Sequence, residues 1–354
     1  MVLAPRPLNL VLARARERAA AGEWSEVRRL LLASLAGERP SPEVTTLAAE
    51  AELRTGRARE AREALTAALP ALERSGDRAA LRKAVNMIGA AGFQLGTLDE
   101  AEQAFSRALE LGREDGDDLL VARATNNLGA IATVRGSREI ALTLYQLAVP
   151  AYQRLGHPLG LAECFHNMAL THREAGRLAR ADECERRAIE FAREAGDSRL
   201  VAMARVGRAE VALRTGDPRL AAETAVRAAR EFVTLADPAF EADALRLLGA
   251  ARTALGELAA ARAALHVAIA LAHEHGSALI EAEALQARAE LALADGDAAA
   301  ASTDAAAALV LFARLGAGPK QEALAGWLAR VRDGGSLPGA AGGSVPDEPG
   351  GAAR

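Results

Sequence analysis

The chain has few aromatic residues and very little cysteine. Only 3% of its 354 residues are aromatic, and Cys164 and Cys184 are its two cysteines. Two cysteines so far apart are too few for a disulfide scaffold or a zinc site, and they are typical of a protein of the reducing cytoplasm. We therefore expect a cytoplasmic protein in which both cysteines are small core residues.

Lysine is scarce and long apolar runs are absent. Lys83 and Lys320 are the only lysines, and the net charge is −4. This balance argues against direct binding of nucleic acid. No apolar run approaches the length of a membrane span, and the N-terminal run is too short for a signal peptide. The sequence thus predicts neither nucleic acid nor a membrane as partner.

Patterns typical of catalysis or metal binding are missing as well. The histidines His166 and His172 are six residues apart and His273 and His275 are two apart, whereas a helical metal site needs a spacing of four. No serine–histidine–aspartate order, phosphate-binding loop or carboxylate pair stands out. We expect no catalytic residues, no metal and no cofactor.

What the sequence has instead is alanine and a repeat. Turn glycines recur every 40 residues, at Gly56, Gly96, Gly136, Gly176, Gly216, Gly256 and Gly296, and Gly22 precedes them by 34. A small residue stands seven positions before each of the seven, and alanines stand five and twelve positions after it. Such a period indicates stacked helical hairpins, in which glycine permits the turn and small residues let the helices approach. Since alanine favours helix and no segment alternates like a strand, the predicted fold is all-α.

Residues at the expected helix ends agree with this period. A second glycine series, Gly76, Gly116, Gly156, Gly196, Gly276 and Gly316, has the same step, with Ala236 in its gap, and is expected to end the second helix of each pair. Asp77, Asp117, Asp197 and Asp237 follow as N-caps, and Asp217 precedes an N1 proline, Pro218. Thr97 and Glu100 have the spacing of a capping box.

These matches resemble the tetratricopeptide repeat, in the 40-residue variant of bacterial regulators, kinesin light chains and Leu-Gly-Asn adaptors. The usual period is 34 residues, so the six additional residues are expected to lengthen each helix by close to one turn. The resemblance implies a right-handed superhelical solenoid of about eight hairpins with a C-terminal capping helix.

The expected division of the chain follows from the repeat. Residues 1–7 are a flexible N-terminus, 8–316 are the repeat array, and 317–333 are a capping helix with Ala323, Trp327 and Val331 on its apolar face. Residues 334–354 are rich in glycine and proline and are expected to be disordered.

In the family, the first helices of the pairs line a concave groove in which partners bind. Carried over by position before each turn glycine, the candidate residues for binding a peptide or partner are Lys83, Asn86, Arg123, Asn126, Asn127, His166, Asn167 and Arg173. An asparagine amide donates and accepts, so it can bind the backbone of an extended peptide. The same amides can instead hydrogen-bond a neighbouring helix and fix the stacking of repeats. The sequence leaves both interpretations open.

Charge is uneven along the array. Residues 237–317 carry five arginines against eleven acidic residues. An acidic end of the groove, through Asp243, Glu283 and Glu290, would orient a peptide, although solvated glutamates on alanine-rich helices explain the same count more simply.

The sequence therefore favours a non-catalytic scaffold or adaptor that binds a protein or peptide in the groove. The alternative is a ligand- or peptide-sensing module of a bacterial signalling or transcription system that acts in trans. Neither the partner nor the oligomeric state follows from the sequence.

Overall fold

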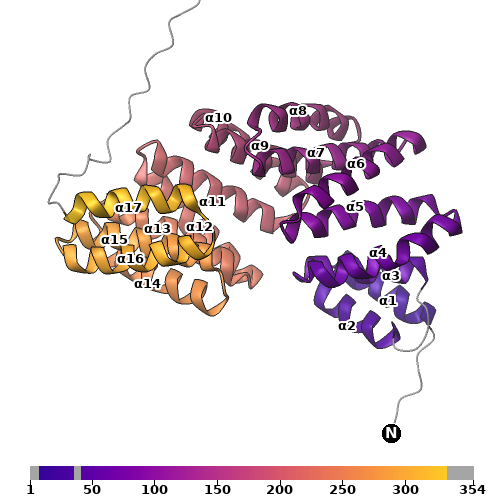
Figure 1. Cartoon of the computed structure of the whole chain (residues 1–354), viewed down its shortest axis with the longest axis horizontal. Helices are drawn as coiled ribbons and strands as arrows, with labels where there is room; N and C mark the ends of the chain where they lie inside the picture. Colours follow the sequence, from indigo (N-terminus) through magenta and orange to yellow (C-terminus); the bar gives the residue numbers. More distant parts are fainter. Residues whose placement is uncertain (1–7, 36–40, 333–354) are drawn as a thin grey trace, which may run out of the picture. The chain divides into compact units, whose positions relative to one another are not determined.

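The computed structural model describes residues 8–35 and 41–332, and every regular element in these ranges is an α-helix. The helices follow one another as α1 (Leu8–Ala20), α2 (Trp24–Leu35), α3 (Pro42–Arg54), α4 (Ala58–Ser75), α5 (Arg78–Gln94), α6 (Leu98–Asp115), α7 (Asp118–Val134), α8 (Arg138–Arg154), α9 (Pro158–Glu174), α10 (Leu178–Glu194), α11 (Ser198–Arg214), α12 (Pro218–Leu235), α13 (Pro238–Ala254), α14 (Leu258–Glu274), α15 (Ala278–Ala294), α16 (Ala298–Arg314) and α17 (Gly318–Arg332). Figure 1 shows them as successive hairpins. The predicted all-α solenoid of about eight hairpins and a cap is confirmed.

The chain divides into two compact units, which we call the N-terminal unit (Met1–Gly160) and the C-terminal unit (Leu161–Arg354). Within each unit, helices that are adjacent in sequence pack against each other. The segments expected to be flexible or disordered, 1–7 and 334–354, lie outside the described residues.

The two repeat periods correspond to two helix lengths. The 34-residue step from Gly22 to Gly56 contains α2 and α3, which have 12 and 13 residues. The next step contains α4 and α5, which have 18 and 17 residues. The two helices of the longer repeat are therefore six and four residues longer, which is more than the single turn per helix that the six-residue difference in period predicts.

Both glycine series end helices in the left-handed backbone region. Gly136 has a φ of 75° and Gly116 a φ of 67°, and Ala236, at 51°, is the only non-glycine residue with a positive φ in the described ranges. This conformation costs alanine more than glycine. The predicted aspartate caps are confirmed as well: Asp77, Asp117, Asp197, Asp217 and Asp237 each accept a hydrogen bond from the backbone N–H three residues later.

The predicted capping box of Thr97 and Glu100 is wrong. The Thr97 hydroxyl donates to the carbonyl of Gly92, 3.3 Å away in the preceding helix, and makes no cap hydrogen bond to α6. Glu100 reaches an ion pair with Arg62 of α4 instead. The tight turn brings the Thr97 hydroxyl to the C-terminal end of α5, where it donates a hydrogen bond to a carbonyl of the last helical turn.

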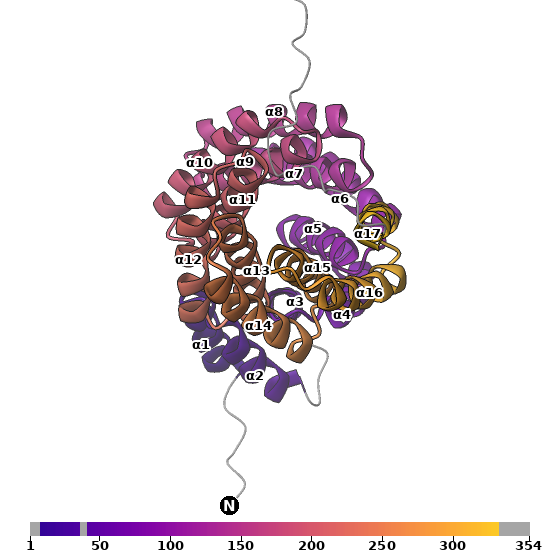
Figure 2. The same cartoon turned by 90° about the vertical axis from the view of Figure 1, so that its left-hand side faces the viewer.

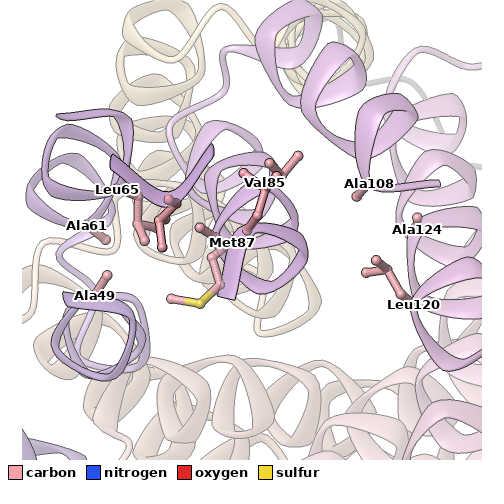
Figure 3. Packing of buried hydrophobic residues seen from close by; sticks show 11 residues of the cluster. Ala49, Ala61, Leu65, Val85, Met87, Ala108, Leu120 and Ala124 are labelled. Atoms are coloured by element: carbon pink, nitrogen blue, oxygen red, sulfur yellow. The ribbon is translucent and has the colours of Figure 1, made fainter. Parts of the chain in front are cut away.

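Small residues and aliphatic side chains fill the space between hairpins. Figure 3 shows Ala49 of α3 and Ala61 of α4 facing each other, with Leu65 and Met87 beside them. The alanines are almost fully buried, which lets the helices approach closely. Cys164 and Cys184 are both buried, and burial raises the pKa of Cys184 to about 11. Both cysteines are therefore core residues.

The capping helix uses a different face from the expected one. Leu324 and Leu328 of α17 are buried against α16, whereas Ala323 is exposed and Trp327 is only partly buried at the edge of the contact. The apolar face is centred on the leucine pair at i and i+4. The sequence-based prediction instead places this face at Trp327.

Candidate functional site

The first helices of successive hairpins lie next to one another within each unit. In the N-terminal unit α5 contacts both α3 and α7, and in the C-terminal unit α13 contacts both α11 and α15. Second helices such as α4 and α6 do not approach each other to the same extent among the described residues. The closer set lies on the inner side of a curved stack, so the first helices form the concave face of each unit. We call this surface the first-helix face.

In the N-terminal unit, predicted site residues from two neighbouring first helices meet. The Asn127 side-chain amide on α7 donates to the Asn86 side-chain oxygen on α5 over 3.5 Å, and both residues are half-buried. The contact is long, so it holds the two amides together weakly. Each amide has two donor hydrogens and an acceptor oxygen, and one contact leaves most of this capacity available.

Two predicted cations border this amide pair. Lys83 is exposed and forms a 2.8 Å ion pair with Glu50 of the preceding first helix. Arg123 is exposed and lies 3.4 Å from Nε2 of His157. Burial lowers the pKa of His157, and the Arg123 charge lowers it further, so the imidazole stays neutral near pH 7. Both cations therefore remain at the surface, within reach of a ligand.

Asn126 does not belong to this accessible set. Asn126 is 3% exposed, because its position on α7 places its side chain in the packing between helices. The sequence places Asn126 and Asn127 side by side, but a 100° step between them turns one inward and the other toward the face. We correct the predicted binding role of Asn126 to a structural one.

In the C-terminal unit, His166 is part of a buried ionic cluster. Its Nδ1 lies 3.0 Å from Oε2 of Glu185 on α10, a carboxylate that is fully buried. Glu185 lies against Gly207 of α11, where a Cβ atom would collide with it, and beside the Arg173 guanidinium. Arg173 in turn pairs with Glu210 at 3.2 Å.

Burial and charge act against each other in this cluster. Burial lowers the pKa of His166, but the charge and hydrogen bond of Glu185 outweigh it, and the pKa is raised overall. Burial raises the pKa of Glu185, and His166 and Arg173 counter only part of that shift. His166 and Arg173 are therefore held by contacts within the unit. Asn167, beside them on α9, is half-buried, and its backbone carbonyl accepts from Thr171.

The acidic end of the array is largely neutralised by ion pairs. Arg246 is close to both Asp243, at 2.6 Å, and Glu283, at 3.4 Å, and Lys320 also binds Glu283. Burial lowers the pKa of Arg246, but these two carboxylates outweigh it and raise the pKa overall. Glu290 is exposed and accepts a hydrogen bond from the side-chain amide of Gln286. Asp243 and Glu283 are therefore paired with cations, whereas Glu290 is an exposed carboxylate bound by a neutral amide.

Sequence reasoning missed Glu185, which connects His166 to Arg173. A signal for it exists in the repeat: nine residues after the turn glycine, the other full repeats have Leu65, Phe105, Tyr145, Ala225, Leu265 and Ala305. A charged residue at an otherwise apolar position marks a buried polar cluster. Among the described residues, no group of three histidine, cysteine, aspartate or glutamate side chains is arranged to hold a metal ion. No helix in the described ranges combines the length and the apolar character that a membrane crossing requires.

Comparisons with known proteins agree with this architecture. Residues 120–194 match a family model described as tetratricopeptide repeat. No curated protein sequence matches the chain. A crystal structure of a Rap protein complexed with competence and sporulation factor superposes with a TM-score of 0.62 at 12% identity, covering 92% of this chain and 98% of that one.

Two other solved structures share the fold. The STAND protein PH0952 from Pyrococcus horikoshii, described as having a tetratricopeptide repeat sensor, gives a TM-score of 0.64 at 16% identity over 89% of this chain and 49% of its own. Aspartyl phosphate phosphatase F from Bacillus subtilis gives 0.54 at 12% identity, over 95% and 98%. The chain thus matches about half the length of the first and nearly all of the second. At these identities the likeness concerns the fold alone.

Proposed function

We propose that this chain, a helical solenoid in which residues 120–194 match the tetratricopeptide repeat, is a non-catalytic scaffold that binds an extended peptide or a partner helix on its first-helix face. In the N-terminal unit the binding residues are Lys83, Asn86, Arg123 and Asn127. In the C-terminal unit they are Asn167 and the exposed edges of His166 and Arg173. Each unit presents its own set, and the partner is a protein or peptide.

The observation that carries this proposal is the contact between Asn86 and Asn127. Two half-buried amides from neighbouring first helices are held side by side, with most of their hydrogen-bonding capacity unused. An extended peptide presents alternating N–H and C=O groups that match such amides. Lys83 and Arg123 flank the pair and add attraction for acidic side chains or a carboxylate of the ligand.

The test uses peptides selected from a random display library on the wild-type protein, with affinities measured by fluorescence anisotropy. We expect Asn127→Ala with Asn167→Ala to weaken binding by about 1 kcal/mol or more, because peptide groups lose their partners. The melting temperature should change little. Gln146→Ala, an exposed amide on the second helix α8, is the matched control and should leave binding unchanged.

The opposite result assigns the amides to the architecture. If the double variant melts earlier while the folded fraction binds the peptide with wild-type affinity, the asparagines only fix the stacking of repeats. Failure of every selected peptide to bind in solution would contradict the scaffold role itself.

A second candidate is a sensory module whose ligand changes the packing of the repeats. The observation in its favour is the ionic cluster around Glu185, because a buried charged group can be satisfied in more than one arrangement. Hydrogen exchange in α9, α10 and α11 that changes when a selected peptide binds supports this role, and exchange that changes only at the contacted residues argues against it.

A further inference from the structure

A pocket rich in arginine lies between α10, α11 and α12 of the C-terminal unit, helices that Figure 2 shows next to one another. Its volume is about 240 Å³. Five arginines line it: Arg186, Arg193, Arg205, Arg208 and Arg227. They come from one stripe on each of the three helices, since residues three or four apart share a helical face.

Two of these arginines occupy positions that are apolar in most repeats. Eleven residues before the turn glycine, where Arg205 stands, the other full repeats have Thr45, Val85, Thr125, Phe165, Leu245 and Leu285. At the position of Arg208 they have Ala48, Ile88, Leu128, Met168, Leu248 and Arg288. Only this repeat carries arginine at both positions. Partly burying two guanidinium groups costs desolvation energy that leucines would avoid, so packing alone does not explain them.

Nearby carboxylates pair with some of these arginines, but not with all. Arg205 pairs with Glu231, and its side chain is only 12% exposed. Arg208 and Arg186 share one carboxylate, that of Asp182, at 2.8 and 3.1 Å. Arg193 has no ion-pair partner in the part of the chain that the structure describes. Arg227 pairs with Glu223 at 2.6 Å. With Glu190 on the lining, five arginines face four carboxylates, an excess of one positive charge around the pocket.

The other arginines of the pocket act on the guanidinium group of Arg205. Burial lowers the pKa of Arg205, and the charges of Arg193, Arg227 and Arg208 lower it further. An anion placed among these side chains would relieve this repulsion. Thr224, which is 7% exposed, lines the same pocket, and its hydroxyl has no hydrogen-bond partner among the described residues.

We propose that this pocket binds a small sugar phosphate, with Arg205 and Arg208 on the phosphate group. Guanidinium groups match phosphate oxygens in bidentate geometry, and the Thr224 hydroxyl can donate one more hydrogen bond. Glu190 also lines the pocket and is exposed, so it can accept hydrogen bonds from sugar hydroxyls. The volume is smaller than that of pockets for drug-sized ligands, which suits a phosphate with a compact body.

The test measures binding of ribose 5-phosphate by calorimetry, with ribose and sulfate as comparison ligands. The main variant is Arg205→Leu with Glu231→Leu, which removes an ion pair without changing the net charge. The two leucines are the residues that the next repeat has at these positions, Leu245 and Leu271. We therefore expect the double variant to fold. We expect binding to weaken roughly tenfold or more, as for loss of hydrogen bonds to a charged group, and the melting temperature to hold or rise.

A single-charge comparison on α12 completes the design. Arg227→Gln should weaken binding, and Arg230→Gln, the same charge change at an exposed position outside the pocket, should not. The inference is overturned if the wild type shows no saturable binding of ribose 5-phosphate, or if all variants bind alike. Binding of sulfate as tight as that of the sugar phosphate would also overturn it, because the pocket would then recognise anions in general.

Discussion

One repeat of the N-terminal unit and one of the C-terminal unit fill the same position with opposite chemistry. In the N-terminal unit Tyr145, nine residues after Gly136, is fully buried, and its hydroxyl lies 3.0 Å from that of Thr133. In the C-terminal unit the corresponding residue is Glu185, also fully buried, and it is paired with His166. One backbone architecture therefore accepts an aromatic ring or an ion pair, depending on which neighbouring residues make room.

The neighbour that makes room differs between the two units. The Tyr145 ring lies against Gly129, where an added Cβ would come within 2.6 Å of the ring. Phe105 lies against Gly89 in the same way, whereas the residue equivalent to Gly129 in the repeat of Glu185 is Ala169. Both aromatic rings thus pack against a glycine seven residues before the turn, whereas a leucine at this position packs against Gly249 in one repeat and Ala49 in another.

The largest expected effect is in the N-terminal unit. Tyr145→Ala removes a fully buried aromatic side chain and should destabilise the unit by about 3–5 kcal/mol. Because each repeat contacts only its neighbours, hydrogen exchange should increase mainly in α7 and α8. Tyr145→Phe is the control and should cost about 1 kcal/mol for the lost hydrogen bond. An equal loss of stability in both variants would show that burial of the ring does not stabilise the unit.

A smaller effect is expected from the glycine beneath the ring. Gly129→Ala should cost about 1–3 kcal/mol in urea unfolding, because the Cβ overpacks the contact with Tyr145. Adding Tyr145→Leu should recover part of this loss, since Ala49 accommodates Leu65 at the same two positions. A double variant less stable than the sum of the two single changes would contradict the pairing of these positions.

The two units should also differ in their response to pH. The pKa values of His166 and Glu185 are both raised in the folded state, so the folded unit binds more protons than the unfolded chain. Stability from His166 is then fully present below its unfolded pKa of about 6.5 and is lost as the pH rises through its folded pKa. We expect the urea midpoint of the C-terminal unit to fall as the pH rises above about 6.5. In His166→Leu with Glu185→Leu this part of the pH dependence should disappear, and an unchanged slope would exclude the pair as its source.

The smallest expected effect is at the end of the C-terminal unit. Trp327 is only partly buried, so Trp327→Ala should cost about 1 kcal/mol, well below the value for a fully buried ring. Leu328→Ala is the matched change and should cost about 2–3 kcal/mol, since that side chain is buried. Denaturation curves of both variants test the assignment, and a larger loss for Trp327 would restore the tryptophan as the main capping contact.

The repeat pattern predicted the fold well because backbone requirements recur. Turn glycines and aspartate caps act within a few residues, so each could be located from the spacing alone. The direction of Asn126 and the apolar face of α17 were predicted less well, because a one-residue step decides whether a side chain is buried. The partners of His166 and Glu283 lie on other helices, and the period does not specify which side chains meet there.

The candidate site shows the same limit. Family position located Asn86 and Asn127 on adjacent helices, and the structure brings them together. Glu185, Arg205 and Arg208 depart from the repeat and were overlooked, although comparing the repeats position by position reveals all three. In a regular array, the informative residues for function are those that break the pattern.

Because the turns between repeats share the same left-handed backbone conformation, whole repeats can be deleted or added in the gene without changing the turns. Deleting residues 257–296 would join Gly256, with a φ of 77°, to Asp297, which now follows Gly296 with a φ of 85°. The new junction keeps a left-handed glycine followed by an aspartate cap, so a recombination event that removes one period creates no foreign loop. The length of such a protein can therefore change in whole steps during evolution, and each step alters the extent of its binding surface without requiring a new fold.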